Sequence, residues 1–197
     1  MTAVLVKTAA VCVTMLFMVS LMRRGDVRKN IPALIGSCIG LVIPAGLFNI
    51  HQMLIWCILM LHSYTDVSEH TVFSMVTYAA VAGEVVYGIV IRSYAVQPLY
   101  MLIFPTVLII SLTKLLRGLA DGDMELFILV MLYAYNMGRR PEAYSVGYMT
   151  VAMIMFVLYT GAANAVRLVR HKETSRYGAF VPAMALSYLI TECVVML

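Results

Sequence analysis

Two aspartates that each follow a glycine are the residues of this chain best suited to catalysis. Asp26 follows Gly25 in the stretch RRGDVRKNIPAL, and Asp123 follows Gly122 in ADGDMEL. Two carboxylates held close together cannot both ionise cheaply, so such a pair shares one proton. The ionised carboxylate can act as a base on water, while the protonated one polarises a scissile carbonyl. This hydrolytic chemistry needs neither a metal nor a covalent intermediate.

The surroundings of these aspartates allow a functional and a structural interpretation. A glycine before an acid lets the backbone come close to a substrate strand. Two further acids, Asp121 and Glu125, flank Asp123 in a chain of which only 12% is charged. However, aspartate also caps helix starts, and the helix dipole favours acids in a first turn. Asp26 stands among basic residues, with which it could form an ion pair at a membrane interface. Spacing alone leaves both interpretations open.

The elements that would position these acids are membrane helices. Hydrophobic residues make up 62% of the chain and form runs at roughly 3–22, 31–49, 51–63, 71–91, 97–116, 124–137, 145–166 and 179–196. A span takes about 20 residues, so 51–63 and 124–137 are short. We predict an all-α polytopic membrane bundle of about eight transmembrane helices. Seven or six are the alternatives, because 51–63 could continue the previous helix beyond a bend near Pro44.

The distribution of basic residues gives an orientation. If all eight runs span and the N-terminus is outside, the inside loops contain Arg23, Arg24, Arg28, Lys29, Lys114, Arg117, Arg167, Arg170, Lys172 and Arg176, and the outside loops contain Arg92, Arg139 and Arg140. The positive-inside rule supports this arrangement. Four predicted spans lie between Asp26 and Asp123, so both acids fall at the cytosolic boundary. We therefore expect a protein of the inner or plasma membrane with a cytosol-facing site.

The rest of the composition narrows the possible partners. No polar stretch is long enough for a soluble domain, so we predict a single integral-membrane domain over 1–197. The four cysteines lie far apart within apolar runs, unlike the clustered thiols of zinc or redox sites. We expect no metal and no cofactor. We attribute the net charge of +4 to the basic loops on the inner side of the membrane. The expected partner is therefore the lipid bilayer, and we expect no nucleic-acid partner. Gly36 and Gly40 form a G-x-x-x-G pair, which lets two helices approach closely.

Three motifs, in this order, resemble the type IV prepilin peptidase family, which includes archaeal preflagellin peptidases. These are integral-membrane aspartic proteases of the G-x-G-D kind. Their first motif is an aspartate that ends a helix, a basic stretch and then Ile-Pro-Asn, which corresponds here to Asp26, the basic pair 28–29 and Ile31-Pro32. Their second motif is G-x-G-D-x-K-L, and residues 120–126 read ADGDMEL. A weaker similarity is SRYGAFVPA at 175–183, which contains Gly178, Phe180 and Pro182 and resembles a Gly-Pro-Phe-like start of the last helix.

The resemblance implies a leader peptidase. Its catalytic pair would be Asp26 and Asp123, and its supporting or substrate-binding residues would be Gly25, Asp121, Gly122 and Glu125. The expected partner is a prepilin-like precursor with a short basic leader, a glycine at the cut site and a hydrophobic helix. Larger family members also methylate the new N-terminus and carry an insert with paired cysteines. The sequence contains nothing like that insert, so we expect cleavage without a methyltransferase module.

The chain departs from the family pattern at three positions. Ala120 replaces the first glycine of G-x-G-D, Ala33 replaces the asparagine after Ile-Pro, and Glu125 replaces the lysine. A catalytically inactive membrane assembly partner, for a pilus or a secretion machine, therefore stays an alternative. Glu125 either attracts the basic leader of the precursor or is only a first-turn acid favoured by the helix dipole.

Other acids suggest a second alternative from a different class. Glu84 lies in the middle of an apolar run, where an ionisable residue indicates a functional site. With Asp123 and Lys7 as further relay groups, the chain could be a small proton- or ion-coupled transporter.

We expect Asp66 to be solvated in a loop. Glu192 is expected to reach water near the outer end of the last helix.

Overall fold

The computed structural model describes residues 2–22, 27–69, 72–91, 98–115, 121–169 and 179–196. All regular structure in these ranges is helical, comprising eight α-helices and one short 3-10 helix. The predicted all-α class is therefore confirmed. Each predicted apolar run corresponds to one of the α-helices, with the 3-10 helix forming the end of the second run.

The chain divides into two compact units. The first unit contains Met1–Thr71 and Ala152–Leu197, and the second contains Val72–Val151. The first unit therefore combines the two ends of the sequence, while the second is one continuous segment that includes Asp123. The single peptidase domain predicted over 1–197 stays a prediction.

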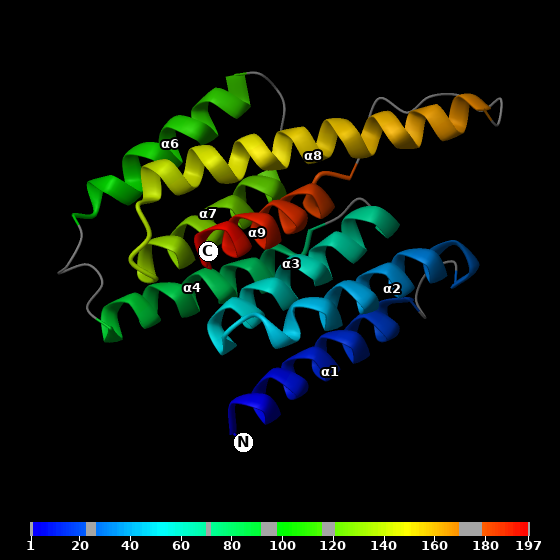
Figure 1. Ribbon diagram of the computed structural model, residues 1–197, viewed down its shortest axis with the longest axis horizontal. Coiled ribbons are helices and arrows are strands. Elements are labelled where there is room, and N and C mark those ends of the chain that lie inside the picture. Colours follow the sequence, from blue (N-terminus) through cyan, green and yellow to red (C-terminus); the bar gives the residue numbers. More distant parts are fainter. Residues whose placement is uncertain are drawn as a thin grey trace. The chain divides into compact units, whose positions relative to one another are not determined.

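In the first unit, a central helix is packed against three others. The elements are α1 (Thr2–Met22), α2 (Val27–Val42), η1 (Ile43–Gly46), α3 (Ile50–Glu69), the later part of α8 (Pro141–Val169) and α9 (Val181–Met196). The central helix, α3, contacts α1, α2 and α9, and α1 and α2 also contact each other (Figure 1). Ile55, Leu59 and Tyr64 of α3 are buried in the core of this unit.

The doubtful run 51–63 is a helix in its own right. The 3-10 turn η1 contains Pro44 and separates α2 from α3. The carbonyl of Pro44 accepts hydrogen bonds from the backbone N–H groups of Leu47 and Phe48, both at 2.9 Å. The chain therefore turns here instead of continuing as a bent helix. The helix α3 also extends six residues beyond the apolar run, to Glu69.

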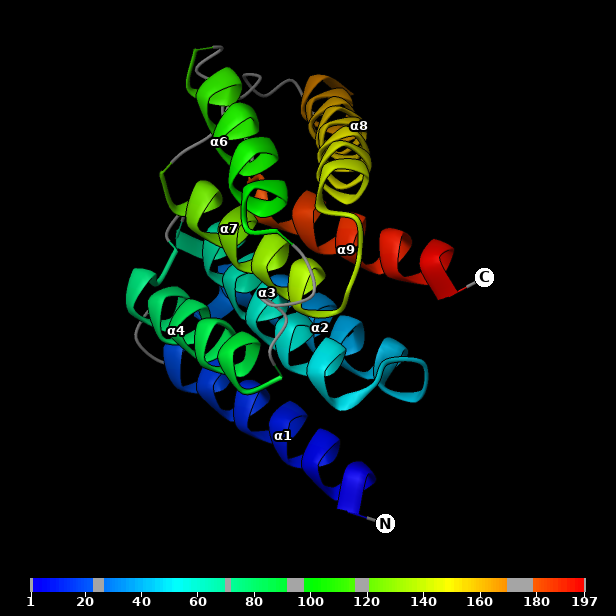
Figure 2. The same ribbon diagram turned by 90° about the vertical axis from the view of Figure 1, so that its left-hand side faces the viewer.

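The second unit contains α4 (Ser74–Val90), α6 (Tyr100–Leu115), α7 (Asp121–Asn136) and the first part of α8. The helix α7 contacts both α4 and α6, and Figure 2 shows it between them. Twelve of the 16 residues of α7 are buried. The chain leaves α7 through Gly138, whose φ of 70° suits glycine, because other residues rarely adopt the left-handed conformation.

The two apolar runs that looked too short to span a membrane are α3 and α7, the central helices of their units. A helix enclosed by other helices does not need a continuous apolar surface, because its polar side chains find partners within the protein. Thr65 and Ser63 of α3 and Asn136 of α7 are buried in this way. Burial by neighbouring helices thus explains why these two runs are short.

Two helices are long and apolar enough to cross a membrane by length and composition alone, namely Thr2–Leu21 and Pro141–Val169. Shorter apolar helices occupy Ile31–Gly46, Ser74–Val90, Tyr100–Ser111 and Val181–Val194. Signal sequences and buried helices of soluble proteins can satisfy the same criterion. The described residues form eight α-helices, whereas the number of membrane spans stays a prediction.

The start of α2 differs from the prediction. The apolar run begins at Ile31, and the family motif has Ile-Pro opening the helix, but α2 begins at Val27 and encloses Pro32. Pro32 is the sixth residue of α2, beyond the first N–H groups that have no partner within the helix, so it removes one backbone hydrogen bond there. The helix nevertheless continues through Pro32 to Val42.

Candidate acidic site at the start of helix α7

The best-described part of the candidate site is the first turn of α7. The helix begins at Asp121 and has Asp121 and Asp123 in its first turn. The side chain of Asp121 is exposed, whereas that of Asp123 is buried, with 7% of its surface accessible. Unpaired backbone N–H groups and the helix dipole stabilise negative charge at this end. The local structure therefore favours both acids, but of the two only Asp123 is buried.

Gly122 is required by a close contact within the second unit. A Cβ atom added at Gly122 would lie 2.8 Å from the Cβ of Val72. Real Cβ atoms do not come so close, so any larger residue at 122 would displace either Val72 or the start of α7. The sequence suggested that this glycine gives a substrate strand access to the backbone. In the structure, the space beside its Cα is occupied by Val72.

Glu125 is tied to the neighbouring helix α4. The hydroxyl of Tyr78 donates a hydrogen bond of 2.6 Å to Oε1 of Glu125. The other carboxylate oxygen, Oε2, is buried and has no hydrogen-bond partner among the described residues. One oxygen of Glu125 is therefore held by the protein, and the other retains its capacity to accept a hydrogen bond.

The first aspartate motif cannot be compared in the same way. Asp26 and Gly25 lie outside the described residues, as do Ala120 and Gly178. The described helices on either side of Asp26 are α1, which ends at Met22, and α2, which begins at Val27. In the third motif, Phe180 is buried just before α9 and makes an edge contact with Phe156, with ring centroids 5.1 Å apart.

Glu84 forms a buried polar pair that the sequence did not reveal. It lies in α4 and is only 6% exposed. The side-chain Nδ2 of Asn136 in α7 donates to Oε2 of Glu84 at 2.9 Å and to its backbone carbonyl at 2.8 Å. This pair joins the two helices that also carry Tyr78 and Glu125. It joins α4 to the end of α7, whereas the Tyr78–Glu125 hydrogen bond joins α4 to a residue near the start of α7.

Two expectations about acids in the first unit are wrong. Asp66 is not in a solvated loop, since it belongs to α3 and its Oδ2 accepts a 2.9 Å hydrogen bond from the backbone N–H of Val181. It thereby satisfies an N–H group at the start of α9. Glu192 does not reach water, because it is fully buried and its Oε2 accepts a 2.6 Å hydrogen bond from Nε2 of Gln52. Both partners are more than 100 residues away in the chain.

Lys7, the third proposed relay group, also has a structural role. Its Nζ donates a 3.3 Å hydrogen bond to the carbonyl of Ala45 in η1. This contact joins the first part of α1 to the turn that follows α2. Within the described ranges, no three His, Cys, Asp or Glu side chains come together as a metal site requires.

No known protein family, characterised protein or solved structure matches the chain. The functional argument therefore rests on its own residues. These are the two Gly-Asp motifs, the buried position of Asp123 and the contacts that hold the start of α7.

Proposed function

We propose that this chain is a membrane aspartic endopeptidase, which removes the short basic leader from prepilin-like precursors. The observation that carries the proposal is the position of Asp123. It is buried in the first turn of α7, directly after a glycine that is packed against Val72. The burial of this carboxylate at the start of a helix, where the dipole stabilises its charge, supports a chemical role for it.

In the proposed mechanism, Asp26 and Asp123 share one proton and act on a single water. One carboxylate removes a proton from the water, which attacks the scissile carbonyl. The protonated partner donates a hydrogen bond to the carbonyl oxygen and stabilises the charge that develops there. Collapse of the tetrahedral intermediate then breaks the C–N bond, and the leaving amine takes up a proton.

The surface of the described helices supports an integral-membrane protein. In the two helices of spanning length, only 11% of the most apolar window of α1 and 17% of that of α8 is buried. Leu16 in α1 and Val157 in α8 are each more than 60% exposed. Lipid satisfies such surfaces, whereas water does not. We propose location in the inner or plasma membrane, with the N-terminus outside and the site facing the cytosol.

The helix order is compatible with a shared site for the two aspartates. Four described α-helices, α2, α3, α4 and α6, lie between α1 and α7 in the chain. If all four span the membrane, the residues before α2 and those at the start of α7 face the same side. A cytosolic position suits the expected substrate, whose basic leader stays in the cytosol and whose cut site precedes a membrane helix.

A second candidate function rests on the Glu84–Asn136 pair. An ionisable residue buried in the middle of a membrane helix commonly belongs to a proton or ion path. However, Asn136 donates two hydrogen bonds to Glu84, and this arrangement also explains the residue as a link between α4 and α7. We rank transport second, and an inactive assembly partner third.

Co-expression with a designed precursor tests the proposal. The precursor carries a Lys-rich leader, a glycine, a hydrophobic helix and a C-terminal tag, and leader removal is detected by mass and N-terminal sequencing. We expect removal by the wild-type chain and loss of removal with Asp26→Asn and with Asp123→Asn. Normal removal by either variant would refute the aspartate pair. Proton uptake that depends on Glu84, without any cleavage, would favour transport.

A further inference from the structure

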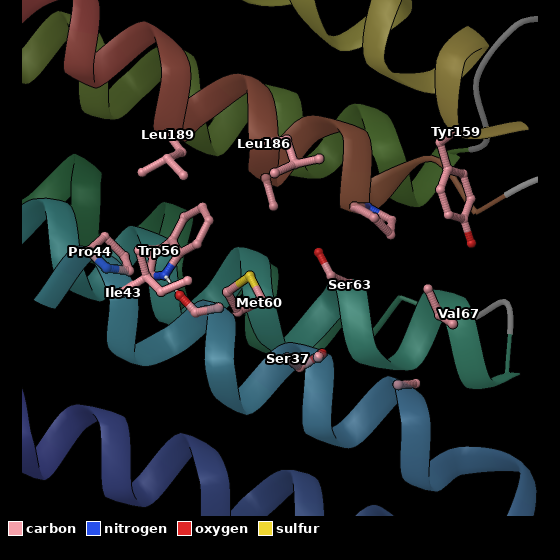
Figure 3. A pocket seen from close by; sticks show the side chains of 15 residues that line it. Ser37, Ile43, Pro44, Trp56, Met60, Ser63, Val67, Tyr159, Leu186 and Leu189 are labelled. Carbon is pink, nitrogen blue, oxygen red and sulfur yellow. Dashed lines mark hydrogen bonds between the residues drawn. The ribbon is translucent and has the colours of Figure 1, made fainter. Parts of the chain in front are cut away.

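An apolar groove lies where α2, α3 and α9 meet in the first unit. Its volume is about 390 Å³, and it is lined by side chains of these helices and by Tyr159 of α8. Figure 3 shows Leu186 and Leu189 extending from α9 toward Trp56 and Met60 of α3. The exposed side chains of Ile43 and Leu186 stand at its rim, so the groove is open to the molecular surface.

The α2 side of the groove consists of small residues. Ala33, Gly36, Ser37 and Gly40 recur at helical spacing and line one face of α2. Gly40 is already used by the fold, because an added Cβ would lie 2.5 Å from Cε of Met60, and its carbonyl accepts a 3.0 Å hydrogen bond from Trp56 Nε1. Gly36 faces open space, with no atom within 4 Å of an added Cβ. In the G-x-x-x-G pair, Gly40 therefore packs against α3, whereas the space beside Gly36 is empty.

Ser37 provides a second, independent observation. It lines the groove (Figure 3) and is only 7% exposed, and none of the hydrogen bonds among the described residues involves its hydroxyl. Its neighbour across the groove, Ser63, bonds instead to the carbonyl of Leu59 at 2.8 Å. A buried hydroxyl normally has a partner. Ser37 therefore offers a donor and an acceptor to whatever fills the groove.

The direction of the groove relates it to the first aspartate motif. It follows α2 from Ala33 to Ile43, about 15 Å at the helical rise per residue, which matches about three turns of another helix. Val67 in the last turn of α3 and Pro182 in the first turn of α9 mark the same end as Ala33. This is the end nearer the beginning of α2, and Asp26 immediately precedes that helix in the sequence.

We propose that this groove binds the hydrophobic helix of the precursor, an inference that rests on the proposed peptidase function. The helix would lie along α2 with its N-terminal end toward Ala33, the end of the groove nearer the start of α2. The small residues let a helix backbone come close to α2, and Ser37 can bond to a backbone carbonyl or a small polar side chain. A lipid chain would use neither feature, which is why we assign the groove to a helix.

Photocrosslinking tests binding independently of cleavage. A photoreactive phenylalanine analogue replaces Leu186 at the groove rim or, as a control, Val157, an exposed residue of α8 that does not line the groove. Both proteins also carry Asp123→Asn so that the tagged precursor remains intact. We expect a covalent product with the precursor helix from position 186 and none from position 157.

Filling the groove tests its role in cleavage. Gly36→Leu adds a side chain to open space and raises helix propensity, so the variant should fold. We expect cleavage of the membrane-anchored precursor to fall by about tenfold or more, because close helix contact is lost. Gly161→Leu is the matched control, since Gly161 is also a helical glycine in open space but lies outside the groove. Ser37→Ala gives a smaller loss and serves as a second variant.

The two experiments separate failure of the inference from failure of the peptidase proposal. If Gly36→Leu and Ser37→Ala both cleave the precursor at the wild-type rate, the groove assignment is overturned and the peptidase proposal still stands. Crosslinking of position 186 to lipid alone would overturn it as well. Crosslinking to the precursor without any wild-type cleavage would uphold helix binding and refute the peptidase. Absence of both crosslinking and cleavage would refute both proposals.

Discussion

The phenol of Tyr78 in α4 donates a 2.6 Å hydrogen bond to Oε1 of Glu125 in α7, while Oε2 of the same carboxylate is buried without a partner among the described residues. The carboxylate is therefore oriented by one oxygen and has acceptor capacity at the other. The negative charge of Glu125, near the start of α7, would attract a lysine or arginine of a basic leader. In the proposed function, Glu125 therefore both holds Tyr78 and attracts the leader, and substitutions can separate these two roles.

Neutralising Glu125 should weaken binding of a basic leader. Glu125→Gln keeps the side-chain shape and an acceptor for Tyr78, but it removes the charge. Because charge-assisted hydrogen bonds contribute about 1.5–3 kcal/mol, we expect the KM for a Lys-rich leader to rise about tenfold or more with little change in kcat. Tyr78→Phe is the control, since it removes only the phenol that orients the carboxylate. Equal KM values for the wild type, Glu125→Gln and Glu125→Lys would show that Glu125 has no substrate role.

A methyl group at Gly122 should disturb the position of Asp123. Gly122→Ala places a Cβ 2.8 Å from that of Val72, so either Val72 or the first turn of α7 must shift. A displacement of about 1 Å at a reacting group can reduce the rate about 100-fold, and we expect a kcat loss of up to that size. Val72→Gly should restore part of the activity, whereas Val72→Ala should not, because it retains the clashing Cβ.

Gly147→Ala is the matched control for this prediction. Gly147 lies in α8 of the second unit, and an added Cβ there meets nothing within 4 Å. Its substitution should leave leader cleavage unchanged. Full activity of Gly122→Ala would mean that the close approach of Val72 has no bearing on the site.

The Glu84–Asn136 pair should contribute to stability more than to catalysis. Asn136→Ala removes the donor to both the carboxylate and the carbonyl of Glu84. We expect a loss of about 1–2 kcal/mol in unfolding free energy, since the buried carboxylate loses its amide partner. Thermal unfolding in detergent measures this effect. Glu84→Gln should lose less, because its amide oxygen still accepts from Asn136, and it should cleave like the wild type. Abolished cleavage in Glu84→Gln would assign Glu84 to the mechanism instead.

Removing the carboxylate of Asp66 should loosen the start of α9. Its Oδ2 accepts the N–H of Val181, the first residue of that helix. Loss of a capping acceptor costs about 0.5–2 kcal/mol, so Asp66→Ala should lower the Tm measurably. Asp66→Asn retains an oxygen acceptor and should remain close to the wild type. If Asp66→Ala has the same Tm as Asp66→Asn and the wild type, this hydrogen bond does not stabilise α9.

The sequence predicted the helices well, because hydrophobic runs determine where a membrane-type helix forms. It predicted α3 less well, since the apolar run ends at Ser63 whereas the helix continues to Glu69. The added residues include Asp66, whose partner Val181 lies 115 residues further along the chain. The predicted start of α2 was late because Ile31-Pro32 was taken as the opening of the helix, whereas α2 begins at Val27 and contains Pro32.

The site was predicted by residue type, but its internal contacts were not. A Gly-Asp motif at a helix start can be read from seven consecutive residues, and the buried Asp123 in the first turn of α7 agrees with it. The contacts of Glu125 with Tyr78 and of Glu84 with Asn136 depend on how α4 packs against α7. No local pattern encodes such packing, just as none indicated that Glu192 is buried against Gln52.

The measurement that tests the central claim most directly is cleavage of the tagged precursor by purified protein in lipid vesicles. The wild type, Asp26→Asn, Asp123→Asn and the double variant are compared at equal amounts and with equal thermal unfolding. Residues that act as one unit are strongly non-additive. We predict that either single substitution abolishes cleavage and that the double variant is no worse than the single ones. Cleavage at the wild-type rate by Asp26→Asn or Asp123→Asn, or independent additive losses, would contradict the aspartate pair.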